Sequence, residues 1–173
     1  MSEYIKEIKN QKITLYSNIL LLSRNKIFYT KFNLIDTFQN RINLIFLHIS
    51  FIFIKVKQDK KSSVFKFFYQ EMFDLIFDKI ELNMREIGYG DSVINKNMRY
   101  LVKSFYNILL TCEKYKKMSK FDKGIFLSKY LSQKNTDNIT KYADIISYFD
   151  KYDAFCFDLS CDSVLSGELK FKL

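Results

Sequence analysis

The sequence predicts an all-α fold, a single compact bundle of about six helices with a less regular C-terminal tail. The chain has 173 residues, 48% of them hydrophobic, which is enough for one domain with a buried core. It contains no proline and only four glycines, where average usage gives about nine and about twelve. Sheets and barrels need tight turns built on these two residues, so their scarcity favours helices. Apolar residues also recur at intervals of three and four along most of the chain, as in amphipathic helices.

The periodicity of residues 1–57 predicts two helices. The first covers residues 3–23. Asp36 and Thr37 can cap the second, which runs to about Lys57 and is apolar nearly all round, so we expect it at the centre of the bundle. The most apolar stretch, 42–54, is thirteen residues long, whereas a membrane span needs about 20. This stretch is therefore predicted to be a buried core helix.

Four more helices are predicted after residue 63. A polar loop at 58–63 leads into a third helix, which should end near Gly88 because glycine reaches the left-handed conformation that closes a helix. Asn95 can cap a fourth helix, and shorter helices are expected near 119–132 and over 137–152. The last twenty residues are less periodic, and we expect an extended tail packed on the bundle. Because no repeat or linker divides the chain, we predict one helical domain.

The formal charge of +9 is concentrated in one part of the chain. Residues 1–120 hold 21 Lys or Arg and 11 Asp or Glu, whereas residues 121–173 hold 7 and 8. Such an excess suggests nucleic acid, the ribosome or an anionic membrane as a partner. However, 24 of the 28 basic residues are lysines, and the abundance of Lys, Ile, Asn, Phe and Tyr is also what an A+T-rich genome encodes. Direct reading of bases is therefore disfavoured, while contact with phosphates or lipid head groups stays open.

The sequence offers no catalytic or metal-binding constellation. Its three cysteines, an odd number without a Cys-x-x-Cys pair, favour a reduced compartment over a disulfide framework. The only histidine, His48, is far from any cysteine in sequence and stands among bulky apolar residues. We interpret it as a hydrogen-bonded core residue, with axial haem ligation as the less favoured alternative. No nucleophile and base are paired with an orienting group, so neither an enzyme nor a cofactor is expected.

Half of the glycines lie in the segment 82–93. Gly88 and Gly90 resemble the start of a dinucleotide-binding fingerprint, but Val93 occupies the position of its third glycine and no strand precedes it. The segment is better explained as a helix C-cap followed by a turn. Three charged residues can form a network that fixes this turn and presents charges to a partner: Arg85, Glu86 and Asp91.

Residues 84–93 resemble the LREMGVGDxxV signature of the ubiquinol–cytochrome c chaperone family. Matches in the same order extend the resemblance over about residues 36–173: Asp36-Thr37-Phe38 with His48, residues 73–78, Lys96 with Met98, Phe105-Tyr106 and Ser166-Gly167-Glu168-Leu169. Two positions depart from the family pattern, because Asn107-Ile108 replaces Gly-Arg and Lys55-Val56 replaces Arg-Leu. Contacts that those arginines make in the family are therefore expected to be weakened or rearranged here.

The resemblance implies a mostly helical, non-enzymatic chaperone over residues 36–173, preceded by an N-terminal helical extension over residues 1–35. Members of the family bind newly made cytochrome b and support its assembly into ubiquinol–cytochrome c reductase, and mitochondrial members also associate with the ribosome. The implied partner is therefore cytochrome b rather than a small-molecule substrate. Further candidates are the ribosome or its RNA, an anionic membrane surface and a second assembly factor.

The absence of a presequence suggests an alphaproteobacterial-type member in the cytoplasm, peripheral to the inner membrane. The alternative function, from another class, is a basic helical protein that binds RNA or the ribosome without a cytochrome client. Deciding between them requires an experiment on cytochrome b itself.

The resemblance places the candidate site in the signature turn. We expect this turn to face a partner or to define the fold, with His48 packed behind it and Phe105 and Tyr106 in support. The residues that carry this hypothesis are Arg85, Glu86, Gly88, Gly90, Asp91, Val93 and Lys96. No catalytic, metal-binding or cofactor-binding residue is assigned.

Overall fold

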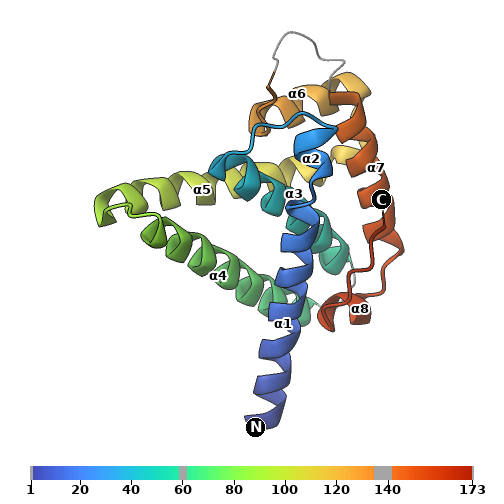
Figure 1. Ribbon diagram of the computed structural model, residues 1–173. Coiled ribbons are helices and arrows are strands. Elements are labelled where there is room, and N and C mark those ends of the chain that lie inside the picture. The colour runs from blue at the N-terminus through green and yellow to red at the C-terminus, as the bar shows by residue number, and fades with distance from the viewer. Residues whose placement is uncertain (1, 59–61, 135–141, 173) are drawn as a thin grey trace.

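The computed structural model describes residues 2–58, 62–134 and 142–172, which form helices and connecting turns without a strand (Figure 1). Six α-helices in these residues are at least eleven residues long. They are α1 (Ser2–Ser23), α3 (Phe38–Gln58), α4 (Ser62–Glu86), α5 (Asp91–Cys112), α6 (Lys120–Tyr130) and α7 (Ala143–Asp158). The short elements are α2 (Ile27–Thr30), the 3-10 turn η1 (Tyr115–Lys117) and α8 (Cys161–Leu165). The predicted all-α class is therefore confirmed.

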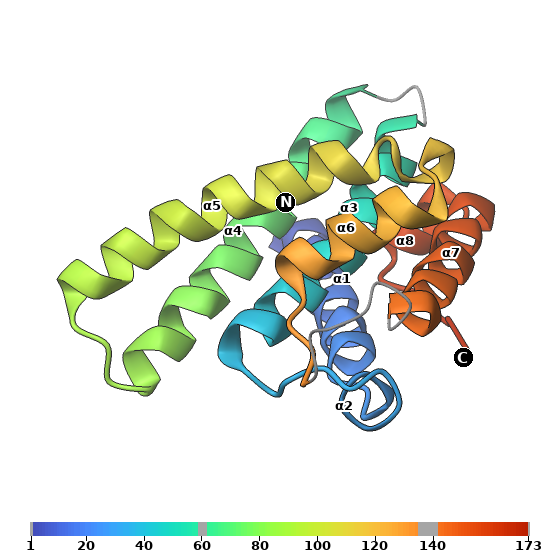
Figure 2. The ribbon, with the colours of Figure 1, turned by 90° about the horizontal axis from the view of Figure 1, so that it is seen from above.

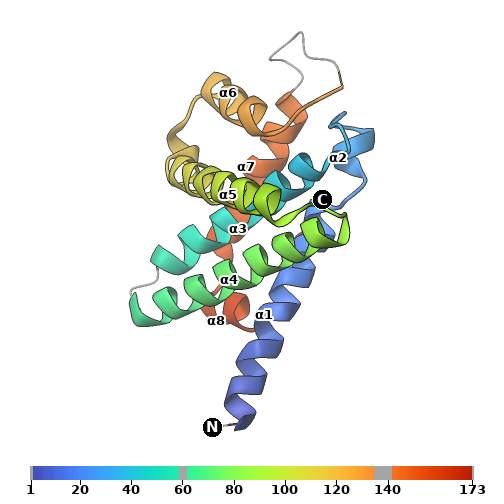
Figure 3. The same ribbon diagram turned by 90° about the vertical axis from the view of Figure 1, so that its left-hand side faces the viewer.

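Helix α3 lies at the centre because its side chains are apolar on every face. Fourteen of its 21 residues are buried. Phe46 packs on Phe77 of α4 and Phe105 of α5, with ring centroids 5.5 and 5.2 Å away. Phe51 stacks on Phe149 of α7. Figures 2 and 3 accordingly show α3 between the α4–α5 pair and α7, as predicted for the most apolar stretch.

Capping explains where two of the helices begin. Thr37 caps α3 as predicted, because its hydroxyl accepts a backbone N–H three residues further on at 3.2 Å. Helix α5 begins at Asp91, so the predicted start at Asn95 is wrong. The carbonyl of Gly90 already accepts N–H groups of the first turn at 3.0 Å, and the carboxylate of Asp91 lies in that turn, where the helix dipole favours negative charge.

The C-terminal part is more helical than predicted. Helix α7 runs to Asp158, beyond the expected end at residue 152, because Tyr152 and Cys156 extend its buried face by one turn. Its predicted start at residue 137 lies outside the described residues, as do residues 59–61 of the predicted loop at 58–63. The other three residues of that loop are helical, because α3 runs to Gln58 and α4 begins at Ser62. The expectation of a wholly extended tail is wrong, since α8 interrupts it and buries Val164.

The N-terminal helix α1 is part of the packed structure. Its side chains Leu15, Tyr16 and Ile19 are buried in the core. That residues 1–35 form a separate N-terminal extension stays a prediction. None of the described helices is both long enough and apolar enough to cross a membrane.

Candidate partner-binding site

The signature turn joins α4 to α5 at the left of Figure 1, away from α7 and α8. Gly88 ends α4 with a φ of +95°, which glycine adopts without a Cβ clash. The N–H of Gly88 donates to the carbonyl of Arg85 at 3.0 Å, and the N–H of Tyr89 donates to the carbonyl of Met84 at 3.1 Å. These two bonds form a Schellman motif, which satisfies carbonyls that the helix end would leave unpaired. The C-cap predicted from the sequence is therefore present.

Replacing Gly88 with alanine is expected to lower the free energy of unfolding by about 1–2 kcal/mol. The cost comes from the backbone alone, because a Cβ at this position meets nothing within 4 Å. Gly90→Ala is the matched control, since Gly90 has a φ of −73° and equally open surroundings. Denaturant unfolding of both variants measures the difference. Equal losses would contradict a requirement for the left-handed conformation at Gly88.

A charged network fixes the outside of this turn. The guanidinium of Arg85 donates to Asp91 at 2.6 Å and to Glu81 at 2.8 Å, so it bridges the last turn of α4 and the first turn of α5. The hydrogen bonds that Arg85 donates to Glu81, and then to Asp91, raise the pKa of Arg85, which therefore stays cationic. Glu86 and Lys96 are exposed on either side. The structure thus brings Arg85 and Asp91 together, as the sequence suggested. The second carboxylate bonded to Arg85 is Glu81 rather than the predicted Glu86, because Glu81 lies one helical turn before Arg85 on the same face of α4.

Apolar side chains surround the charged network at the surface. The exposed fractions are 47% for Leu82, 60% for Ile87, 43% for Tyr89 and 44% for Val93. We call this group, together with Arg85, Glu86 and Asp91, the hairpin tip. Sequence reasoning identified Val93 but missed the other three apolar residues. Their signal was that large apolar residues stand at positions outside the buried face of the helix, where polar residues are expected.

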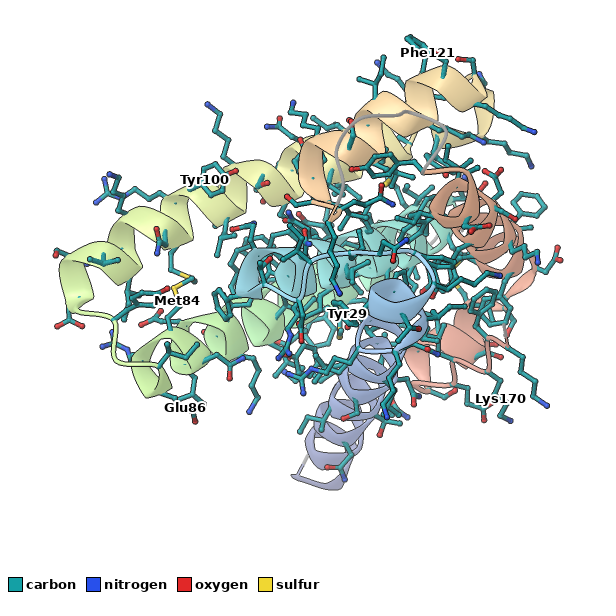
Figure 4. The ribbon with its side chains drawn as sticks, turned by 45° about the horizontal axis from the view of Figure 1, so that its top comes forward. Tyr29, Met84, Glu86, Tyr100, Phe121 and Lys170 are labelled. Carbon is teal, nitrogen blue, oxygen red and sulfur yellow. The ribbon has the colours of Figure 1, made fainter. Side chains whose placement is uncertain are left out.

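Two side chains anchor the hairpin tip to the rest of the molecule. Met84 and Ile94 are each 1% exposed, one from each helix. Figure 4 shows Met84 between α4 and α5, whereas Glu86 projects outward. The tip therefore combines a fixed backbone with charged and apolar side chains in solvent, an arrangement suited to holding a partner.

Asp91→Ala is expected to change the melting temperature by no more than about 4 °C. The carboxylate is 78% exposed and its ion pair with Arg85 is a surface one. Thermal unfolding followed by circular dichroism checks this, with unmodified protein as the reference. A much larger decrease would mean that the network defines the fold rather than a partner surface.

His48 does not lie behind the signature turn, so that expectation is wrong. Its ring is fully buried and faces α2 and α7, among Phe28, Phe149 and Tyr152. The Nδ1–H donates to the carbonyl of Leu44 at 2.6 Å, and Nε2 accepts from the hydroxyl of Tyr148 at 2.7 Å. A carbonyl can only accept, which fixes this neutral tautomer.

Burial lowers the pKa of His48 to about 4. Both ring nitrogens are engaged within the core, which agrees with the interpretation of His48 as a hydrogen-bonded core residue. The haem-ligand alternative would require one of these bonds to break.

The two remaining supporting residues have different surroundings. Phe105 is 1% exposed and packs on Phe46 of α3 and on Phe73 of α4, with centroids 5.2 and 5.7 Å away. Tyr106 is 43% exposed, with its ring 6.0 Å from that of Phe73. Phe105 therefore joins α5 to α3 and α4 and supports the hairpin from inside, while Tyr106 lies on its surface.

An apolar groove between α1, α4 and α8 is a second feature that sequence reasoning missed. It has a volume of about 550 Å³ and is lined by Leu15, Phe67, Met72 and Val164 among others. Phe67 is 53% exposed, and an ion pair between Lys12 and Glu71 crosses the rim. The lining comes from segments at both ends of the chain, which is why no local pattern indicated it.

Two of the cysteines in the described part of the chain, Cys112 and Cys156, are buried. No group of three or more His, Cys, Asp or Glu residues there could hold a metal ion. Burial raises the pKa of the Cys112 and Cys156 thiols, so both are protonated and poorly nucleophilic at neutral pH.

Comparisons with known proteins give a family match and a structural match. A model of the family described as ubiquinol-cytochrome C chaperone matches residues 30–171. Among solved structures, the crystal structure of the Cbp3 homolog from Brucella abortus is similar, with a TM-score of 0.82 and 20% sequence identity, covering 99% of this chain and 93% of that one. At this identity the likeness shows a shared fold. The comparison with curated proteins gives no match.

Proposed function

Because the chain belongs to the ubiquinol-cytochrome C chaperone family, we propose that it binds newly made cytochrome b and supports the assembly of ubiquinol–cytochrome c reductase. The observation that carries this proposal is the family match over residues 30–171, which includes the whole hairpin tip. The proposed activity is binding without a catalytic step. The hairpin tip supplies charges and apolar contacts to the client rather than a nucleophile and a base.

The exposure of the signature side chains supports a partner-facing role for them. Arg85 and Asp91 are 50% and 78% exposed, so the core gains little from them. Ile87 and Val93 also stand in solvent, where a folded protein gains nothing from apolar groups. Since the turn is already ordered by its Schellman bonds, a client would meet a preformed surface and the complex would lose less conformational entropy.

A membrane-protein client before assembly exposes apolar segments that need cover from water. The hairpin tip provides apolar side chains for this purpose, with Arg85 and Asp91 available for polar groups of the client. The groove between α1, α4 and α8 provides a second apolar surface for the same client. The proposed location is the cytoplasm of an alphaproteobacterial-type cell, peripheral to the inner membrane, with a second assembly factor or the ribosome as additional partners.

Deletion of the gene is the direct test of the client. Reduced-minus-oxidised difference spectra of membranes should then show a large loss of cytochrome b, and re-expression of the chain should restore it. A normal cytochrome b spectrum in the deletion strain would contradict the chaperone proposal and favour the alternative of an RNA- or ribosome-binding protein.

The role of the hairpin tip is tested by complementing the deletion with an Arg85→Ala/Asp91→Ala variant. We expect co-purification of cytochrome b with the tagged variant to fall about tenfold or more, as for a central interface contact. Lys57→Ala/Glu113→Ala is the matched control, because it removes another surface ion pair, with a 2.6 Å contact, away from the turn. Equal capture by both variants at equal protein levels would exclude the tip as the client surface.

A further inference from the structure

The solvent face of α5 carries a regular row of cations. Lys96, Arg99 and Lys103 are spaced by three and four residues, which places them on one side of the helix. All three are exposed, and no carboxylate in the described residues forms an ion pair with any of them. We call this row, together with Tyr100 and Leu110, the α5 basic face.

The segment that contains the α5 basic face also has far more basic than acidic residues. Residues 92–121 contain seven Lys or Arg and a single acidic residue, Glu113. The carboxylate of Glu113 is paired with Lys57 at 2.6 Å, so it does little to neutralise the row. This segment therefore carries most of the net charge of +9.

Exposed apolar side chains interleave with these cations. Tyr100 is 61% exposed and Leu110 is 58% exposed, and Phe121 at the start of α6 is also 58% exposed. Figure 4 shows Tyr100 and Phe121 projecting from the same edge of the molecule. Aromatic and aliphatic groups beside lysines are typical of surfaces that sit at the lipid head groups, where the apolar parts enter the interface and the amines stay in water.

We propose that the α5 basic face docks on the surface of an anionic lipid bilayer. The 22 residues of α5 form a straight edge about 33 Å long, which suits a flat partner. Lipid is favoured over RNA for two reasons. Lys outnumbers Arg in the row, and the apolar side chain of Leu110 would find no apolar group to contact on a phosphate backbone. The α5 basic face would then make the membrane contact of the peripheral location proposed above. This inference does not rest on client binding.

Vesicle flotation with the full-length chain tests the proposal. Binding is compared between vesicles of phosphatidylcholine alone and vesicles that also contain phosphatidylglycerol, at low and at physiological salt. We expect binding only to the anionic vesicles, weaker at the higher salt. Lys96→Gln/Lys103→Gln should lower the partition coefficient about 30-fold, since each lysine near the surface contributes about fivefold. Tyr100→Ser should lower it severalfold without any change in charge.

The matched control is Lys26→Gln/Lys31→Gln, which removes the same charge from exposed positions that flank α2, on the opposite side from α5 in Figure 2. Circular dichroism confirms that all variants are folded. An equal decrease in the control variant would overturn the proposal, as would equal binding to uncharged vesicles. Tighter binding to an RNA oligonucleotide than to anionic vesicles, lost with Lys96→Gln/Lys103→Gln, would reassign the face to RNA and also overturn it.

Discussion

Replacement of Gly167 with alanine is expected to lower the free energy of unfolding by about 3 kcal/mol or more. Gly167 has a φ of +83°, and an added Cβ would lie 2.7 Å from the carbonyl oxygen of Gln11 and 3.1 Å from the nitrogen of Leu15 in α1. Both are backbone atoms of a helix, so neither can turn aside as a long side chain would. The C-terminal segment would have to shift, which would weaken the hydrogen bond from Asn18 to the Gly167 carbonyl at 2.8 Å.

Gly88→Ala is the control that isolates the contact with α1. Gly167 ends α8 in a Schellman motif, as Gly88 ends α4. The N–H of Gly167 donates to the carbonyl of Val164 at 3.0 Å, and the N–H of Glu168 donates to the carbonyl of Ser163 at 2.8 Å. The two glycines therefore share a backbone conformation and differ in their neighbours. Denaturant unfolding should show a clearly larger loss for Gly167→Ala. Equal losses for the two variants would mean that α1 does not restrict this position.

Stability is expected to fall by about 2 kcal/mol between pH 7 and pH 5 because of His48. Burial lowers the pKa of its imidazole from 6.5 to about 4 in the folded protein. Between these values the unfolded chain binds a proton that the folded core excludes, so the free energy of unfolding decreases as the pH falls. The loss begins near pH 6.5 and is complete below about pH 4.

The measurement is a series of denaturant unfolding curves from pH 7 to pH 5 for the unmodified protein and for His48→Gln. Glutamine has an amide that can donate and accept hydrogen bonds but does not titrate in this range. Its absolute stability will differ, so the comparison uses the slope against pH. We expect the slope of the variant to be flatter, and identical slopes would show that His48 is not the group that titrates.

Local features of this protein were predictable from its sequence because they depend on neighbours along the chain. The spacing of apolar residues predicted the helices, and Thr37 at the start of α3 and Gly88 at the end of α4 have the roles expected of them. The start of α5 was misplaced because Asn95 and Gly90 are both plausible caps, and only the hydrogen bonds to the Gly90 carbonyl distinguish them. The extra turn of α7 depends on burial of Cys156 against distant segments.

Within the site, the sequence by itself determined the turn and its charged pair, since Arg85 and Asp91 are six residues apart and a Schellman turn brings their helices together. Tertiary structure alone decided which side chains face solvent at the hairpin tip, where His48 points, and which glycine is crowded. His48 is hydrogen-bonded to Tyr148, 100 residues further along the chain. Gly167 packs against α1 and accepts a hydrogen bond from Asn18, which is 149 residues earlier in the sequence. Such contacts leave no periodic trace, because they depend on how whole helices pack rather than on what each segment prefers locally.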